Sequence, residues 1–149
     1  MNTKETLKNL YKQNVSLEIK NKILRLLIDK VAITCSSELD LKFEKLLNDN
    51  KMYWSEFEPL HHDEFYTEQV QYNKILESIH LLQSNREFSF GIFYNATGQL
   101  IGHISLYSIK RLPYSSGFIG YSMDEKFTGR GIVTEAVRLI MEFAFITLN

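Results

Sequence analysis

The sequence predicts a mixed α/β (α+β) domain, in which a mainly antiparallel sheet is flanked by helices. Three observations support this fold class. Apolar residues alternate with a period of two through much of 88–123, with turn residues between the runs, which is typical of a strand meander. Two earlier segments, 39–50 and 66–83, carry apolar residues at helical spacing. Residues 120–145 read as the end of a strand, a tight glycine loop and an apolar helix.

Length and composition indicate one domain spanning residues 1–149, with 1–14 as a possible tail. The 17 basic and 18 acidic residues nearly cancel, so bulk charge gives no reason to expect a nucleic-acid partner. One cysteine cannot form an internal disulfide. There is no apolar run of membrane length and no signal-peptide pattern. We therefore expect a soluble cytoplasmic protein without a membrane partner.

The first half of the chain is predicted to hold strands and then two helices. Residues 15–19 and 22–28 alternate well enough for a strand pair or one bent strand. Ser36 or Ser37 can cap the next helix, which is expected to end near Asn50. Its apolar residues are Leu39, Phe43, Leu46 and Leu47.

A second helix is predicted over 66–83. Its apolar positions are Tyr72, Ile75, Leu76, Ile79 and Leu82. The segment 52–62 between the two helices is rich in aromatic and polar residues, and we expect it to be irregular.

The meander comprises three predicted strands, 88–94, 99–107 and 117–123, joined by a turn at 95–98 and a connection at 111–115. A final helix is expected over roughly 132–148. Its charged residues, Glu135, Arg138 and Glu142, fall on a narrow stripe, and so apolar a helix is expected to be covered.

The run Thr128-Gly129-Arg130-Gly131 opens the final helix and is the strongest functional signal. A helix start offers unpaired backbone N–H groups and a favourable dipole for anions, most often phosphate. Glycines let the backbone approach a ligand, and Arg130 adds donors. The alternative is an ordinary strand-turn-helix connection. The nucleotide-triphosphatase loop is excluded because Ile132-Val133 follows Gly131, and the dinucleotide motif is excluded because its third glycine falls at Thr134.

This run resembles motif A of the GNAT N-acetyltransferases, Q/R-x-x-G-x-G/A. Gly131 matches, whereas Thr128 and Val133 depart from the pattern. The wider run of residues 120–136 is similar to the branch that includes ribosomal-protein-alanine acetyltransferases. The resemblance implies an acetyl-CoA-dependent N-acetyltransferase. Its acceptor would be a primary amine, either a protein N-terminus, such as that of a ribosomal protein, or a small amine.

The resemblance also implies roles for site residues. Backbone groups of Tyr121, Ser122 and Met123 would pair with the pantetheine and the thioester oxygen of acetyl-CoA (coenzyme A). Backbone amides would hold the pyrophosphate along the run Thr128, Gly129, Arg130, Gly131, Ile132 and Val133. No metal is implied.

Catalytic groups are less well defined. Many relatives carry a glutamate on the fourth strand where this chain has Phe118, and the tyrosine that commonly protonates the thiolate lies on a helix after the fifth strand. Glu58, His61, His62 and Tyr121 are substitute candidates, and the alternative for the two adjacent histidines is that they are simply solvated.

The other candidate residues receive structural interpretations. His103 is expected to be a hydrogen-bonding strand residue and His80 to lie on a helix surface. The pair His61-His62 lacks the spacing of a metal site. Cys35 precedes a helix far from the cofactor loop, so we do not expect it to be a nucleophile.

The family continues with a fifth strand, a helix and a closing strand pair, whereas this chain ends at residues 146–149. We therefore expect an open sheet edge at 117–123 and a homo-oligomer or strand-exchanged dimer. The last helix would expose Val133, Ile140, Phe143, Phe145 and Ile146. Because activity of so short a chain is uncertain, the alternative function is a catalytically incomplete GNAT fragment acting as a self-associating or partner-binding module.

Overall fold

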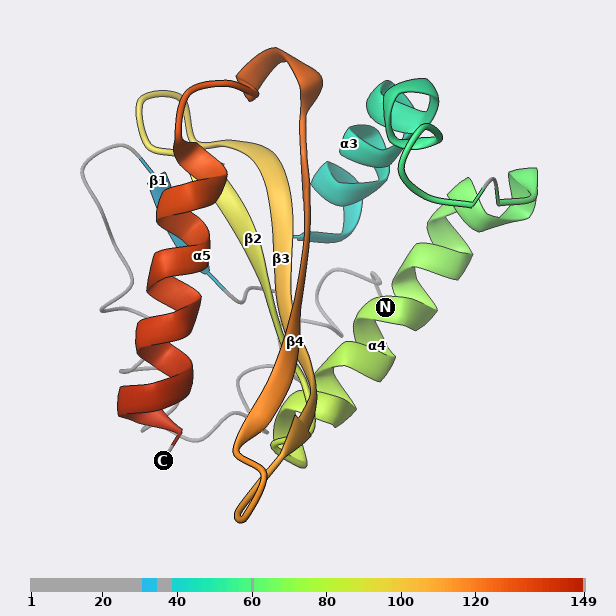
Figure 1. Cartoon of the computed structure of the whole chain (residues 1–149). Coiled ribbons are helices and arrows are strands. Elements are labelled where there is room, and N and C mark those ends of the chain that lie inside the picture. The colour runs from blue at the N-terminus through green and yellow to red at the C-terminus, as the bar shows by residue number, and fades with distance from the viewer. Residues whose placement is uncertain (1–30, 35–38, 60, 149) are drawn as a thin grey trace.

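The structure, a computed structural model, describes residues 31–34, 39–59 and 61–148. A twisted antiparallel sheet forms the middle layer, with helix α5 (Ile132–Glu142) against one face and helices α3 (Leu39–Trp54) and α4 (Glu68–Gln83) against the other (Figure 1). The predictions for 1–28, the cap at Ser36 or Ser37, and Cys35 lie outside the described residues.

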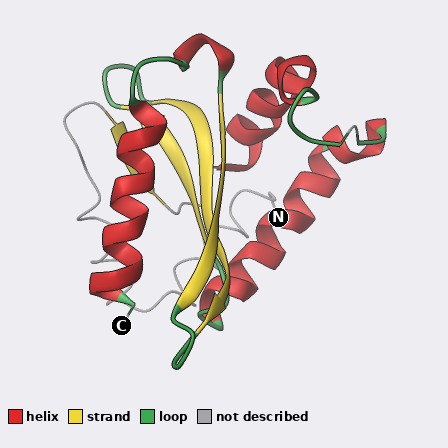
Figure 2. Ribbon diagram, in the orientation of Figure 1, coloured by secondary structure: helices red, strands yellow, loops and turns green. Residues whose placement is uncertain are grey.

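The sheet has the order β1-β2-β3-β4, with every neighbouring pair antiparallel. The strands are β1 (Val31–Thr34), β2 (Phe88–Tyr94), β3 (Gln99–Lys110) and β4 (Ser116–Met123). The predicted meander is confirmed, although β3 continues three residues beyond its expected end. Strand β1 was not predicted. Figure 2 shows the meander and the short loops that join its strands.

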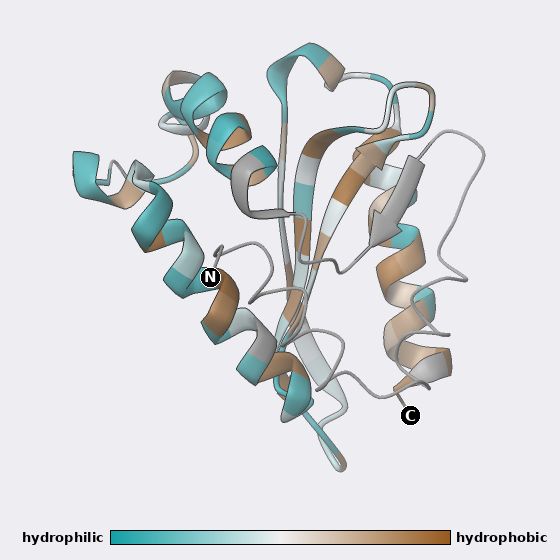
Figure 3. Cartoon of the chain, turned by 180° about the vertical axis from the view of Figure 1, so that it is seen from behind, coloured by the Kyte–Doolittle hydropathy of each residue, from teal (hydrophilic) through white to brown (hydrophobic). Residues whose placement is uncertain are grey.

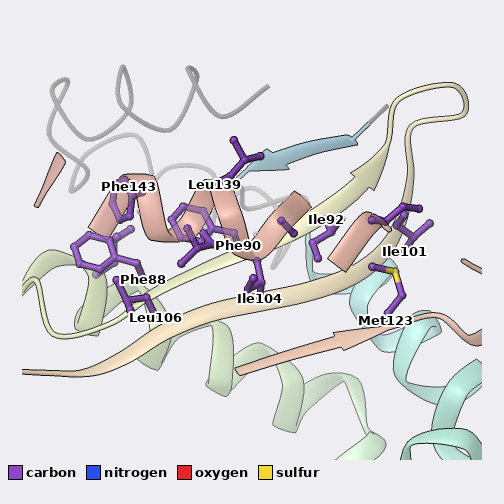
Figure 4. Close-up of a cluster of buried hydrophobic side chains, with 13 residues drawn as sticks. Phe88, Phe90, Ile92, Ile101, Ile104, Leu106, Met123, Leu139 and Phe143 are labelled. Atoms are coloured by element: carbon purple, nitrogen blue, oxygen red, sulfur yellow. The ribbon is translucent and has the colours of Figure 1, made fainter. Parts of the chain in front are cut away.

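The core lies between the sheet and α5. Phe88, Phe90 and Ile92 alternate along β2 and are fully buried, as their period of two predicts. Ala136 and Ile140 of α5 are also fully buried. Figure 4 shows the labelled side chains of the sheet spread along α5, with Phe88 and Phe90 beside Phe143. The helix is therefore fixed to the sheet by a continuous apolar contact.

Two predictions for the last helix, the exposure of its apolar residues and its C-terminal end, are partly wrong. Ile140 and Phe143 are buried, at 0% and 2% exposure, because they face the sheet and not its edge. Phe145 and Ile146, at 61% and 78%, are exposed as expected, and Val133 is half-buried against the core. The helix also ends earlier than predicted, at Glu142, and a π-helical turn, Phe143–Thr147, follows it.

The charged stripe of α5 is confirmed. Arg138 pairs with both Glu135 and Glu142, three residues before it and four after. Seen from behind in Figure 3, α5 is largely hydrophobic, whereas the outer surface of α4 is mostly hydrophilic.

The other face of the sheet carries a smaller cluster of Leu46, Leu47, Trp54 and Leu100. Helix α3 runs to Trp54 and not to Asn50 as predicted. Its buried positions Leu46, Asn50 and Trp54 continue at intervals of four, so the helical face extends into the segment predicted to be irregular.

Helix α4 begins two residues later than predicted. Thr67 has extended backbone angles, and a 3₁₀ turn, Asp63–Tyr66, precedes it. No helix within the described ranges is long and apolar enough to cross a membrane.

Candidate functional site

Strand β4 lies at one end of the sheet, and its backbone alternates between two directions. Asp124 N–H donates to Ile101 O at 2.7 Å, and Ser122 pairs in register with His103. In an antiparallel ladder this register turns the N–H and C=O of Ser122 toward β3 and those of its neighbours away from it. The Ser122 oxygen lies 2.6 Å from the position of a Cβ built on Gly102, which agrees with that direction.

The backbone groups of Tyr121 and Met123 therefore face the open edge, and those of Ser122 do not. Of the three residues expected to pair with pantetheine, only two present backbone groups to a ligand in the plane of the sheet. The Met123 oxygen already accepts a hydrogen bond from Trp54 Nε1 at 2.9 Å. Among these three residues, Tyr121 is thus the one whose N–H and C=O both lack a partner within the part of the chain that the structure describes.

A short 3₁₀ turn, Glu125–Phe127, joins β4 to the glycine loop. Asp124 caps it, since its carboxylate accepts from Lys126 N–H at 3.0 Å. Phe127 N–H donates to Asp124 O, and Thr128 N–H donates to Glu125 O at 3.2 Å. The Thr128 amide is therefore already used within the turn, which leaves the amides after it as anion donors.

The two glycines of the loop adopt left-handed backbone angles, with φ of 72° at Gly129 and 74° at Gly131. Glycine tolerates this region at no steric cost, whereas a branched residue is strained there. A Cβ built on either glycine would meet nothing within 4 Å, so both face open space. Gly131 is the N-cap of α5, and the first amides of that helix have no partner one turn earlier.

Arg130 lies between the two glycines but folds back on the turn. Its Nη2 donates to Lys126 O at 2.9 Å, and its guanidinium carbon lies 5.1 Å from the centroid of the Phe127 ring. Part of its donor fork is thus used internally, so the loop amides and the α5 dipole are the main attraction for an anion.

The end of α3 forms a wall beside this loop. The Asn50 Oδ1 accepts from Glu125 N–H at 3.0 Å, and Trp54 donates to Met123 O. Both residues are buried, at 3% and 7% exposure. Neither residue was predicted from the sequence to lie at the site. The interval of four from Leu46 to Trp54 was the available signal for the helix, but nothing in the sequence indicates which strand end they contact.

On the α3 side of the sheet, β3 and β4 present His103, Tyr107 and Phe118. Tyr107 and Phe118 are exposed and stacked, with ring centroids 5.8 Å apart. The centroids of the His103 and Phe43 rings lie 5.4 Å apart. The hydrogen bond expected of His103 stays a prediction. Burial, and secondarily the nearby Lys74 charge, lowers the pKa of His103 from 6.5 to about 4. The imidazole is therefore neutral at pH 7.

The predicted catalytic candidates lie in two places. Glu58 and His61 line a cavity of about 10 Å³ beside Trp54, a volume that holds one water at most. The His61 ring stacks on Phe65 at 3.8 Å. Tyr121 projects a half-exposed ring from the β4 edge. His80 lies on the α4 surface as expected, and His62 is exposed before the 3₁₀ turn.

No group of three or more metal-ligating side chains occurs among the residues that the structure describes.

An edge strand, an open glycine turn and a helix N-terminus thus lie next to one another, in the order that the resemblance to the GNAT family implies. A family model described as an acetyltransferase (GNAT) domain matches residues 30–149, and the chain belongs to that family. The family predicted from the sequence is confirmed.

Among individual relatives, a probable N-acetyltransferase of Bacillus subtilis (strain 168), YjcK, is 38% identical over 104 residues, which are 70% of this chain and 58% of that protein. The chain thus spans little more than half of that curated relative.

Solved structures share the fold. The ribosomal-protein-S5-alanine acetyltransferase from Vibrio fischeri superposes with a TM-score of 0.76 at 23% identity, covering 82% of this chain and 67% of its own. The microcin C7 self-immunity acetyltransferase MccE, solved with acetyl-CoA and AMP, gives 0.68 at 23% identity, with coverages of 78% and 63%.

Proposed function

We propose that this protein binds acetyl-CoA at the β4 edge and the glycine loop and transfers the acetyl group to a primary amine. The observation that carries the proposal is the loop itself. Gly129 and Gly131 keep the space outside the turn open and adopt angles that favour glycine. The amides at the start of α5 have no partners one turn earlier within the helix, so they can hold a pyrophosphate beside the loop.

The remainder of the cofactor would run along β4. Tyr121 offers an N–H and a C=O at the sheet edge, which can pair with the amide groups of pantetheine as an added strand would. The ligand set therefore consists mainly of backbone groups, and it comprises Tyr121 and the amides from Gly129 to Val133. The Thr128 amide and the backbone of Ser122 leave that set because both bond internally.

Acetyl-CoA supplies the acetyl group as a thioester, which an amine can attack directly. The attacking nitrogen forms the new C–N bond, the C–S bond breaks, and the proton lost by the amine leaves through a base while the thiolate gains one. Phe118 carries no proton-accepting group, so β4 provides no base at that position. Glu58, His61 and Tyr121 stay the candidates for proton transfer.

The relatives support an amine acceptor. YjcK is named as a probable N-acetyltransferase, and MccE was solved with acetyl-CoA. The Vibrio fischeri protein is named for an alanine of ribosomal protein S5. We infer a protein N-terminus or a small amine as the acceptor class for this chain.

Calorimetric titration of the 149-residue chain with CoA and acetyl-CoA tests the proposal. We expect binding by the unmodified chain and its loss in Gly131→Val, where a branched side chain must adopt a φ near 74°. Gly98→Val is the control for backbone strain, because Gly98 has a φ of 66° and equally open surroundings but belongs to the neighbouring β2–β3 turn and not to the loop before α5. Unchanged affinity in Gly131→Val, or equal losses in both variants, would overturn the site.

A second function, self-association, is favoured by one observation. The open edge of β4 carries exposed Phe118 and Tyr121. Such an edge can pair with the β4 strand of a second copy, since its unpaired N–H and C=O groups act as a template. Light scattering of the chain at micromolar concentration tests this: a mass of twice 17.5 kDa that returns to the monomer in Tyr121→Pro supports it, and a stable monomer refutes it.

A further inference from the structure

The turn between β4 and the glycine loop is held from outside as well as from within. Asp124 and its own 3₁₀ turn account for the N–H groups of Lys126, Phe127 and Thr128. Two remaining groups, Met123 O and Glu125 N–H, bond to side chains of α3, a helix about seventy residues earlier in the chain. These two hydrogen bonds therefore fix the position of the loop relative to α3.

The Asn50 amide is oriented by α3 itself. Its Nδ2 donates to Leu46 O at 3.0 Å, one turn earlier, so its Oδ1 is directed at Glu125 N–H, also at 3.0 Å. Neither contact can be made with the amide reversed, because Leu46 O needs a donor and Glu125 N–H needs an acceptor. Burial to 3% exposure means that water does not replace either bond cheaply.

Trp54 makes the second connection four residues later on the same face of α3. Its indole N–H donates to Met123 O at 2.9 Å, and its ring packs in the cluster with Leu46 and Leu47. The two bonds hold alternate residues of the chain, Met123 and Glu125, on either side of Asp124. Together they restrain both translation and rotation of the turn.

We propose that Asn50 and Trp54 are positioning residues for cofactor binding, which fix the glycine loop relative to the wall formed by α3 and the segment that follows it. Neither touches the space where the phosphates would lie. The expected effect on CoA binding rests on the proposed function, whereas the claim that α3 holds the turn in place does not. Because coupling free energies are reciprocal, bound CoA would stabilise the Asn50 and Trp54 contacts by as much as those contacts favour its binding.

The test compares Asn50→Leu with Asn48→Leu. Asn48 makes the same amide bond one turn back, to Glu44 O at 3.0 Å, but it is exposed and does not contact the loop. Trp54→Phe is the second variant, which keeps an aromatic ring and removes the donor. We expect Asn50→Leu and Trp54→Phe to weaken CoA binding at least fivefold by calorimetry, and Asn48→Leu to leave it unchanged.

Amide hydrogen exchange without ligand separates a positioning role from general stability. We expect faster exchange confined to residues 123–131 in the Asn50→Leu and Trp54→Phe variants. Faster exchange throughout the chain, or CoA affinity equal to that of the Asn48→Leu control, would overturn the proposal. If the unmodified chain does not bind CoA, the proposed function fails, and the exchange measurement still decides whether α3 holds the turn.

Trp54 is the single tryptophan of the chain, so its fluorescence reports on this contact directly. We expect the emission of Trp54 to change on addition of CoA to the unmodified chain. An emission that stays constant while calorimetry records binding would contradict the reciprocal part of the coupling.

Discussion

Gly102, near the start of β3, is the glycine at which a single added methyl group should destabilise the protein most. A Cβ there would lie 2.6 Å from the Ser122 carbonyl oxygen, whereas real Cβ atoms essentially never come within 3.0 Å of another heavy atom. The obstacle is backbone, so β4 must move by at least 0.4 Å, the difference between these two distances. Gly102→Ala should therefore separate β3 and β4 beside the proposed cofactor-binding edge of β4.

The change in the free energy of unfolding for Gly102→Ala is the sum of two opposing effects. Overpacking of this kind costs about 1–3 kcal/mol, and replacing glycine by alanine returns about 0.5 kcal/mol by restricting the unfolded chain. The net loss is about 0.5–2.5 kcal/mol. For a domain of this size it lowers Tm by roughly 1–10 °C.

Gly117→Ala is the matched control on the partner strand. Its Cβ would meet Leu106 Cδ1 and Tyr107 O at 3.4 Å, which is ordinary contact. We expect its Tm to be equal to that of the unmodified chain or a few degrees higher. Thermal unfolding followed by circular dichroism measures both, and a Gly102→Ala variant as stable as Gly117→Ala would refute the close approach of the two strands.

Two further perturbations follow from burial and charge. Phe143 is 2% exposed and makes edge-to-face contacts with two rings of β2, so Phe143→Ala should lower the free energy of unfolding, measured in urea, by about 3–5 kcal/mol. Phe145 is 61% exposed, so Phe145→Ala should lower it by less than about 1.5 kcal/mol. Similar losses in the two variants would contradict the packing of α5. The folded pKa of His103, about 4, lies below its ordinary 6.5, so unfolding takes up a proton below pH 6.5. The free energy of unfolding should fall between pH 6.5 and 4 by at most about 3 kcal/mol, and a His103→Leu variant that keeps the same slope would refute this reasoning.

The meander was predictable because its signals are local. Alternation in Phe88, Phe90 and Ile92 and the turn residues before Gln99 are sufficient to define a strand, a turn and a second strand. Likewise, the loop around Gly131 was found because glycines and a following apolar period occupy consecutive positions. Both features depend on neighbours in sequence.

The misplaced features depend on partners distant in sequence. Whether Ile140 or Ile146 is buried depends on the direction in which α5 crosses the sheet, and an almost wholly apolar helix does not encode that direction. The extension of α3 to Trp54 similarly depends on its contact with Met123. Helical spacing continued to Trp54, but the aromatic composition of the segment favoured an irregular structure.

The alternating direction of the backbone N–H and C=O groups along β4 determines which sequence changes the strand can accept during evolution. If the ligand is held by the backbone of Tyr121, the side chain at that position is free to vary, and a search for shared side chains will undervalue the site. Inserting or deleting one residue before Tyr121 is a different matter, because it turns the outward N–H and C=O inward and shifts every later residue of the strand. Substitution by proline likewise has different effects at neighbouring positions of β4. At 121 it removes an N–H that faces the edge, and at 122 it removes one that holds β4 to β3. The strand should therefore accept many substitutions and almost no change in length.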